Sequence, residues 1–188
     1  MSWFLSLTLA AALAGAPGGA PAGSSKTSLA LKTATPSDVA ASLLAAETRR
    51  IRSTTARIGT LINDGVRRSR TFANLVAEVH KTNVIVYVQT SMTLPPEVAG
   101  RILFAGTAGN QRYLRVQVSP SLTRDQMIAV IGHELRHALE VAAEQSVVNE
   151  KALEAFYQRI GDSPHVGGGY DTEAARVAQR TVRQELIG

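Results

Sequence analysis

The most regular pattern in the chain is a run of apolar residues at helical spacing between residues 123 and 142. Thr123 and Gln126 begin it as a T-x-x-Q capping box, in which each side chain accepts a hydrogen bond from the other residue's backbone N–H. The spacing therefore predicts a long helix with one buried side. The apolar residues on that side are Met127, Ile128, Ile131, Leu135, Leu139 and Ala142.

Three segments before that helix have the pattern of β-strands. Residues 82–90 (TNVIVYVQT) are rich in β-branched residues, as a buried strand is, and residues 101–108 form a second segment. Residues 112–119 alternate polar and apolar positions, which predicts one wet face and one buried face. Because Gly109 and Asn110 join the last two segments by a short turn, we expect an antiparallel pair. The strand 112–119 could hold an extended substrate if it formed an edge of the sheet.

Helical patterns continue on both sides of these strands. A first helix is expected to begin at Ser37 or Asp38. Gly59 and the Asn63–Gly65 stretch are expected to break or end it, so that residues 37–65 form a helical N-terminal extension. The chain thus predicts an α+β fold in which a small three-stranded, mixed or antiparallel sheet packs on helices. Further helices are expected at residues 69–80, at 150–160 after Asn149, and from Asp171 or Thr172 to 186.

The first 36 residues differ in composition from the rest of the chain. Residues 1–24 contain a short apolar run followed by Ala20-Pro21-Ala22, an A-x-A-like cleavage site, and predict a signal peptide. The run is too short for a transmembrane helix, so no stable membrane span is expected. Residues 25–36 predict a flexible linker. These features predict an exported protein, periplasmic or secreted, with a single domain at residues 37–188.

The composition limits the chemistry that the domain can perform. The 188 residues include no Cys, which excludes disulfides, thiol nucleophiles and cysteine-bound zinc. The formal net charge is +5, but the arginines are dispersed along the chain, and no aromatic residues alternate with them as in a base-stacking platform. We therefore expect no nucleic acid as a partner, and a basic nucleic-acid binder is kept only as the third-ranked alternative, after an enzyme and a zinc-binding module. No feature of the sequence indicates an oligomeric state.

The predicted long helix carries His133-Glu134-Leu135-Arg136-His137, which has the form H-E-x-x-H. Residues four apart lie on one face of a helix, so His133 and His137 could bind one metal ion together. Glu134 lies at the edge of that face, where its carboxylate could take a proton from water at the metal. The pattern predicts a zinc hydrolase that acts on a peptide or protein substrate.

Through His133, Glu134 and His137 the chain resembles the zincin-like metalloproteases. The resemblance extends over about residues 69–187 and implies a zincin-like fold, a zinc cofactor and peptidase activity. More narrowly, three stretches are similar to a family of small, uncharacterised bacterial proteins of metallopeptidase type. These stretches are residues 113–116 (YLRV), 131–142 (IGHELRHALEVA) and 170–172 (YDT).

A catalytic zinc ion usually has three protein ligands, so one more is expected beyond the two histidines. A metzincin would have Gly at position 140 and His at 143, where this chain has Glu140 and Ala143. The resemblance therefore implies a gluzincin-like site, with an acidic ligand from a later helix. Asp171 and Glu173 are the candidates. Glu140 is a further alternative, either as a ligand or as an acceptor beside a ligand histidine.

The resulting hypothesis is amide hydrolysis, in which Glu134 accepts a proton from water and passes it to the leaving amine. His165, Tyr157 and Tyr170 are candidates for donating a hydrogen bond to the oxyanion. The alternative function is a catalytically inactive zinc-binding module of the cell envelope, which would hold zinc without hydrolysing peptides.

Overall fold

The structure, a computed structural model, describes residues 49–161, 163–164 and 170–188. This part of the chain has an α+β fold with five helices, a four-stranded mixed sheet and a two-stranded ribbon. The predicted signal peptide, the linker and the predicted start of the first helix lie outside the described residues. Within the described ranges we find no helix that combines the length and the apolar character of a membrane span.

The main sheet has the strand order β1-β2-β4-β3. β1 (Ile51–Ser53) pairs in parallel with β2 (Val84–Thr90), and β2 pairs in parallel with β4 (Gln111–Val118). β3 (Gly100–Ala108) runs antiparallel to β4 and forms one edge of the sheet. The predicted antiparallel pair is therefore β3 with β4.

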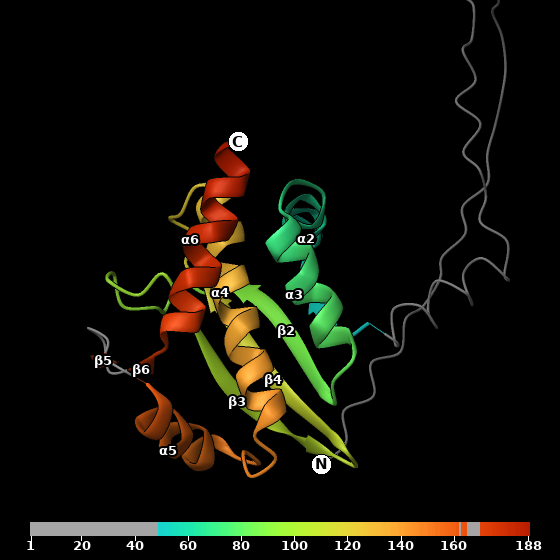
Figure 1. Ribbon diagram of the computed structural model, residues 1–188, viewed down its shortest axis with the longest axis vertical. Helices are drawn as coiled ribbons and strands as arrows, with labels where there is room; N and C mark the ends of the chain where they lie inside the picture. Colours follow the sequence, from blue (N-terminus) through green and yellow to red (C-terminus); the bar gives the residue numbers. More distant parts are fainter. Residues whose placement is uncertain (1–48, 162, 165–169) are drawn as a thin grey trace, which may run out of the picture. The chain divides into compact units, whose positions relative to one another are not determined.

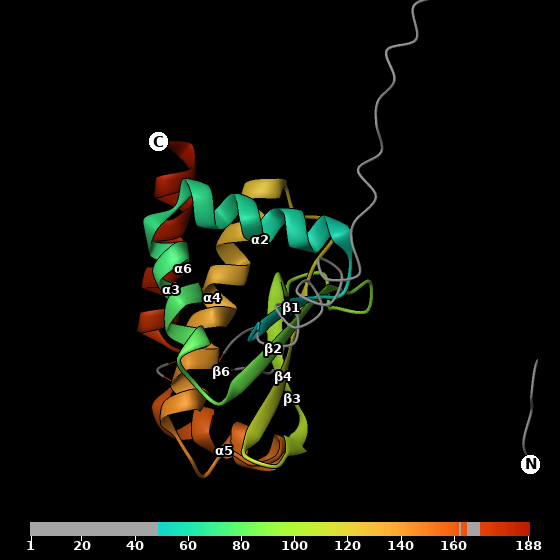
Figure 2. The same ribbon diagram turned by 90° about the vertical axis from the view of Figure 1, so that its right-hand side faces the viewer.

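The helices that cover the sheet lie on one of its sides, as Figure 2 shows. In Figure 1, α4 lies in front of the sheet, between α6 and α3. A ribbon of β5 (Ser163–Pro164) and β6 (Tyr170–Asp171) immediately precedes α6. The helices are α2 (Ala56–Arg68), α3 (Arg70–His80), α4 (Arg124–Ala143), α5 (Glu150–Ile160) and α6 (Glu173–Ile187).

The core lies between α4 and the near face of the sheet. Met127, Ile131 and Leu135 of α4 are fully buried in it. Full burial of such a side chain contributes roughly 1.5–3 kcal/mol, so this contact is a main source of rigidity for α4. Alternate residues of β2 and β4 meet the helix there, and none of them is exposed: Val84, Val86, Val88, Leu114, Val116 and Val118.

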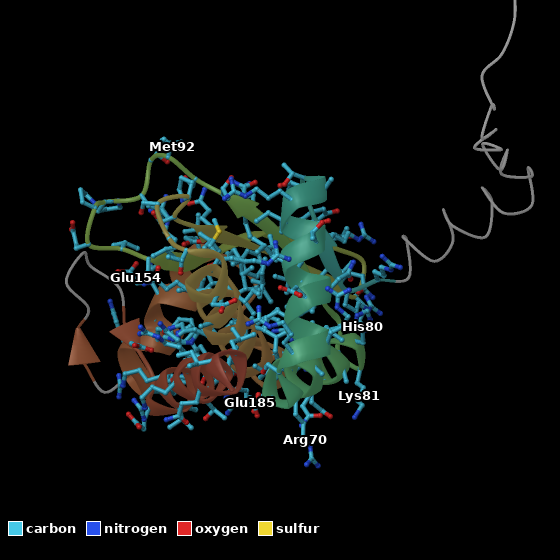
Figure 3. All side chains as sticks on the ribbon, turned by 90° about the horizontal axis from the view of Figure 1, so that it is seen from above. Arg70, His80, Lys81, Met92, Glu154 and Glu185 are labelled. Carbon is cyan, nitrogen blue, oxygen red and sulfur yellow. The ribbon has the colours of Figure 1, made fainter. Side chains whose placement is uncertain are left out.

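Polar contacts fix α6 to the other helices near its C-terminal end. Glu185, labelled in Figure 3, accepts hydrogen bonds from Thr71 N at 3.0 Å and from Thr71 Oγ1 at 2.9 Å. Arg68 Nη2 donates to the carbonyl oxygen of Leu186 at 2.7 Å. Because β6 directly precedes α6, these contacts also help to position Asp171.

The prediction of three strands is wrong, because Ile51–Ser53 add a fourth to the main sheet. The sequence predicts that these residues belong to a helical extension. In the structure they form β1 instead, with Ile51 opposite Val86 of β2. A strand of three residues is too short to show an alternating pattern of its own, and its pairing with β2 decides its conformation.

The predicted helix breakers Gly59 and Gly65 lie inside α2 rather than at its end. Glycine lowers helix propensity by about 1 kcal/mol, but packing can outweigh that cost. A Cβ at Gly65 would lie 2.9 Å from Phe72 Cδ1 and 2.9 Å from Ile128 Cγ2. Gly65 thus permits α2 to approach α3 and α4 more closely than any other residue would.

β4 is not an edge strand, because it lies between β2 and β3. The predicted capture of an extended substrate by residues 112–119 is therefore wrong. β3 forms that edge, where Phe104 N donates to Glu150 Oε2 of α5 at 2.7 Å. The polar side of β4 is also less uniform than the alternation predicts: Arg115 is exposed, whereas Gln117 is buried.

Candidate metal centre

The helix that carries the H-E-x-x-H motif is held at both of its ends. At its start, Thr123 N donates to Gln126 Oε1 at 2.8 Å and Gln126 N donates to Thr123 Oγ1 at 3.4 Å, which is the predicted capping box. At its end, Nη1 of the buried Arg112 in β4 donates to the carbonyl oxygens of Val141 at 2.8 Å and Glu144 at 2.7 Å. The capping box fixes where α4 begins, and the Arg112 contacts fix its end against the sheet.

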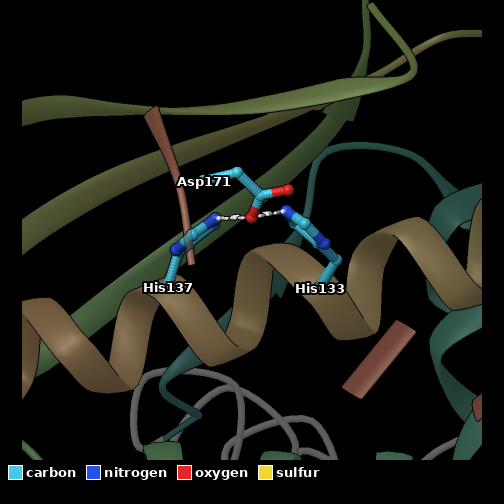
Figure 4. Close-up of side chains that lie close together, drawn as sticks. All are labelled: His133, His137 and Asp171. Atoms are coloured by element: carbon cyan, nitrogen blue, oxygen red, sulfur yellow. Dashed lines mark hydrogen bonds and ion pairs between the residues drawn. The ribbon is translucent and has the colours of Figure 1, made fainter. Parts of the chain in front are cut away.

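His133 and His137 lie one turn apart on α4, and their rings converge (Figure 4). Their Nε2 atoms are 3.1 Å apart, and the ring planes meet at 78°. Both side chains are buried. Two nitrogen lone pairs at this distance repel each other, so the arrangement favours a positive charge between them, either a proton or a metal ion.

Asp171 of β6 approaches the same point from the opposite side, as Figure 4 shows. Its Oδ1 atom lies 3.3 Å from His133 Nε2 and 3.5 Å from His137 Nε2. Thr172 N donates to the same oxygen at 2.7 Å, and Asp171 is only 3% exposed. These three residues form a buried group, drawn from two elements far apart in the sequence, that could hold a metal ion.

The three ligand atoms have the spacing that a tetrahedral metal ion requires. Metal–ligand bonds of about 2.0–2.1 Å at tetrahedral angles place neighbouring ligand atoms about 3.3–3.4 Å apart. The separations here are 3.1, 3.3 and 3.5 Å. Two imidazoles and one carboxylate are also a ligand set used by catalytic zinc, which keeps its fourth position open. The residues therefore fit a zinc ion.

Glu140 supports His137 from the other side of its ring. Glu140 Oε2 lies 2.8 Å from His137 Nδ1, and Glu140 Oε1 accepts a hydrogen bond from Thr172 Oγ1 at 2.8 Å. A carboxylate in this position favours the tautomer with its proton on Nδ1, which directs the Nε2 lone pair toward Asp171. Of the alternatives for Glu140, the structure therefore supports the acceptor and not the ligand.

Tyr157 of α5 packs against the same histidine. Its ring meets the ring of His137 edge-on, with the centroids 4.9 Å apart, and its hydroxyl donates to the carbonyl oxygen of His137 at 3.0 Å. Burial raises the pKa of Tyr157 well above its ordinary value, so the hydroxyl keeps its proton. Because that proton is directed at the backbone of α4, the structure does not support Tyr157 among the candidates for the oxyanion donor. The side chains of the other candidates, His165 and Tyr170, are outside the described part.

Glu173, the other predicted acidic ligand, lies outside the group. Its side chain is 57% exposed, and its two oxygens accept hydrogen bonds from Arg180 Nη2 at 2.7 Å and Arg176 Nε at 3.0 Å. As the first residue of α6, it also interacts favourably with the helix dipole. The structure thus separates the two alternatives: Asp171 faces the histidines, whereas Glu173 faces arginines on its own helix.

Glu134 lies beside the group and is only 4% exposed. Its carboxylate approaches the start of β3, where a Cβ on Gly100 would lie 3.0 Å from Glu134 Oε1 and 2.5 Å from Val130 Cγ1. Gly100 therefore makes room for this carboxylate. Burial raises the pKa of Glu134 to about 7, although the charge of His137 opposes the shift and that of Asp171 adds to it.

The group stabilises a positive charge at its centre. Burial lowers the pKa of His137, but the hydrogen bonds with Asp171 and Glu140 outweigh that effect and raise the pKa to about 9. Burial also acts to raise the pKa of Asp171, yet the hydrogen bond with His137 and the charge of His133 lower it to about 2. The same carboxylates would stabilise a bound cation.

The sequence does not reveal what two further residues, Thr172 and Gly100, do at this site. Thr172 has the pattern of a helix N-cap, and it does accept a hydrogen bond from Ala175 N at 3.2 Å, but it also donates to Glu140. Gly100 gives no signal at all in the sequence, because its importance depends on how β3 packs against α4.

Comparison of the chain with protein-family models, with curated proteins and with solved structures gave no match.

Proposed function

We propose that the chain is a zinc-dependent hydrolase of the zincin-like, gluzincin type and that its substrate is a peptide or protein. The observation that carries the proposal is the triangle formed by His133 Nε2, His137 Nε2 and Asp171 Oδ1, with sides of 3.1, 3.3 and 3.5 Å. An exported location, periplasmic or secreted, is part of the proposal and follows from the N-terminal sequence.

The three side chains would hold the ion through these atoms, and Glu140 would keep His137 in the ligating tautomer. A zinc ion bound there acts as a Lewis acid, which polarises a carbonyl group and makes water more acidic. Two neutral imidazoles and one carboxylate leave a divalent ion with a net positive charge. Asp171 is held in place for this role by Thr172 N.

Glu134 is the proposed general base. One of its carboxylate oxygens accepts a proton from the attacking water, and the same oxygen then delivers that proton to the nitrogen of the leaving amine. The carboxylate returns to its starting state, so the protons balance over one cycle. Gly100 of β3 lies close against Val130 and Glu134 of α4, which leaves the Glu134 side chain little freedom to turn away.

The order of the elements supports the same interpretation. A mixed sheet with an antiparallel edge strand precedes the motif helix, and the acidic residue follows it in the sequence. The resemblance to gluzincins implies an acidic ligand from a later helix; here Asp171 lies in β6, two residues before α6 begins.

The test is a comparison of wild type with Glu134→Gln for zinc content and for hydrolysis of a quenched fluorescent peptide library. We expect both proteins to bind one zinc ion and Glu134→Gln to lose at least about a hundredfold in rate, since general bases contribute that much or more. Loss of zinc from Glu134→Gln would show that Glu134 has another role. Zinc in the wild type without hydrolysis would favour the inactive zinc-binding module of the cell envelope.

A further inference from the structure

The face of the main sheet that points away from the core carries arginine, tyrosine and glutamine side chains, beside the buried Ile85 of β2 and the partly buried Leu103 of β3. Val86 and Val88 of β2 point into the core, so Tyr87 between them points to the opposite face. The strand register places on that face side chains from all four strands. We call the following residues the arginine–tyrosine face: Arg52, Tyr87, Arg101, Tyr113, Arg115 and Gln117.

Side-chain contacts across the strands join all of these residues except Arg115, which the strand register places on the same face. Arg52 Nη1 donates to Tyr87 Oη at 2.8 Å, and the Arg52 guanidinium lies 5.6 Å from the centre of the Tyr87 ring. The rings of Tyr87 and Tyr113 stack with centroids 6.4 Å apart and planes inclined by 22°. Arg101 Nε donates to Gln117 Oε1 at 2.7 Å. The planar groups on this face are therefore already stacked and ordered.

The strands contribute charge of one sign to this face. None of the residues in β1, β2, β3 and β4 is Asp or Glu. The register places Arg52, Tyr87 and Arg115 in one row across three adjacent strands. Neighbouring strands are about 4.8 Å apart, so the two arginines flank Tyr87 along this row, one on each neighbouring strand. Arg115 is exposed, and the two tyrosines are partly exposed.

This arrangement changes the expectation drawn from the sequence that nucleic acid is not a partner. That expectation depends on arginines that are not interleaved with aromatic residues along the chain. The fold interleaves them in space, because Arg52 and Arg115 come from segments 63 positions apart and meet the tyrosines only in the sheet. Linear spacing therefore does not reveal the face.

The chemistry of the face fits single-stranded nucleic acid better than a duplex or a bilayer. Guanidinium groups bind phosphate oxygens in pairs, and tyrosine rings stack on unpaired bases. A four-stranded sheet can stack unpaired bases on its aromatic residues while a single strand lies across it, whereas the bases of a duplex are already stacked on one another. A bilayer would favour projecting apolar side chains, but the large exposed apolar residues of the described part lie in helices and loops: Val66, Met92, Val148, Ile160, Val177 and Ile187.

We propose that the arginine–tyrosine face binds single-stranded RNA or DNA, with phosphates at Arg52, Arg101 and Arg115 and bases stacked against the tyrosine pair. The proposal is independent of the metal centre, since it uses the other face of the sheet.

The first test measures binding of the full-length chain to fluorescein-labelled 20-mers of U and of dT by fluorescence anisotropy in 50 mM salt. We expect dissociation constants of about 10 μM or tighter, with a decrease in affinity as salt is raised. Arg115→Glu should weaken binding about tenfold or more. Arg183→Glu makes the same change of charge at an exposed position on α6 and should change the affinity less than about twofold.

Equal losses in Arg115→Glu and Arg183→Glu would overturn the proposal, because they would show general charge attraction instead of a site. So would the absence of binding to both oligomers in wild type. Binding of vesicles that contain an anionic phospholipid, without binding of either 20-mer, would assign the face to a membrane surface.

A second measurement tests the role of the tyrosines. An abasic 20-mer keeps the phosphates and removes the bases, so it should bind wild type about tenfold more weakly than the dT 20-mer. Tyr113→Leu keeps an apolar side chain without the ring and should reduce this preference for bases. Equal affinity of wild type for the two oligomers would contradict base stacking at this face. Thermal unfolding of each variant checks that the fold is retained.

Discussion

Glu140 Oε2 lies 2.8 Å from His137 Nδ1, on the side of the imidazole ring opposite to the atom that faces Asp171. The two carboxylates thus hold the ring between them. Glu140 reaches this position because it follows His137 by three residues on the same helix, whereas Asp171 comes from the ribbon before α6.

The first prediction concerns this support. Glu140→Ala removes the acceptor for Nδ1 but leaves the three proposed ligands, so zinc affinity should decrease about 10–100-fold, as is typical when such a partner is removed. Competition with a zinc chelator of known affinity measures the change. Glu154→Ala, at an exposed position on α5, is the control and should bind zinc as wild type does. Unchanged affinity in Glu140→Ala would contradict the assigned role.

The second prediction concerns the space around Glu134. In Gly100→Ala the new methyl group would collide with Val130 and crowd Glu134, so both the melting temperature and the rate of peptide hydrolysis should decrease. Gly59→Ala is the matched control. Its Cβ would lie 3.1 Å from Oγ of the exposed Ser53, which can rotate away, and alanine favours the helix by about 1 kcal/mol. If Gly100→Ala is as stable and active as Gly59→Ala, the close packing is not important.

A third prediction tests the contact between α5 and α4. Tyr157→Phe keeps the ring against His137 but removes the hydroxyl that donates to its carbonyl oxygen. The free energy of unfolding should decrease by about 1 kcal/mol, the usual net value of a buried hydrogen bond. Urea denaturation measures it. Tyr87→Phe removes a hydroxyl from the partly exposed sheet face and should cost less, within about 0.5 kcal/mol.

The fourth prediction concerns pH and a site remote from the metal centre. Asp64 accepts hydrogen bonds from Arg124 Nε at 2.8 Å, Arg67 Nη2 at 3.0 Å and Arg68 Nη1 at 3.3 Å, and these hold its pKa well below the ordinary value. A lowered pKa in the folded state means that the ionised carboxylate stabilises the fold above the pKa of the unfolded chain, near 3.9.

Asp64→Asn should therefore melt below wild type at pH 7. The gap should begin to shrink as the pH decreases below about 4 and continue to shrink toward the folded-state pKa, because in this range the unfolded wild-type chain binds a proton at Asp64 while the folded chain does not. Thermal melts of both proteins between pH 7 and pH 2 test this. A gap that stays constant over the whole range would mean that the carboxylate charge does not contribute.

Local patterns predicted the elements that lead to the site. The capping box at Thr123 and Gln126, the 3.6-residue spacing after it and the β-branched run before Thr90 are all short-range signals, and the structure has a helix and strands at those positions. The same patterns failed where tertiary contacts decide the structure. Ile51–Ser53 become a strand only by pairing with β2, and Gly65 lies inside a helix at a point where α3 and α4 leave no room for a side chain.

The candidate site shows the same division. The convergence of His133 and His137 follows from helical spacing alone. The choice between Asp171 and Glu173 does not follow from the sequence. The two carboxylates are only two positions apart, yet one faces the histidines and the other faces the arginines of α6. The order of β4 and β3 in the sheet also cannot be predicted from the sequence, because alternation indicates which face of a strand is buried but not which strand lies at the edge.

The most direct test of the account is the zinc content of purified, full-length protein, measured by mass spectrometry of the metal after dialysis. Wild type and Glu173→Ala should each retain one zinc ion per chain, whereas His137→Ala and Asp171→Ala should retain less than about a tenth of that, because three ligands are needed to hold the ion. A wild type without bound zinc, or an Asp171→Ala variant that keeps its zinc while Glu173→Ala loses it, would contradict the proposed centre.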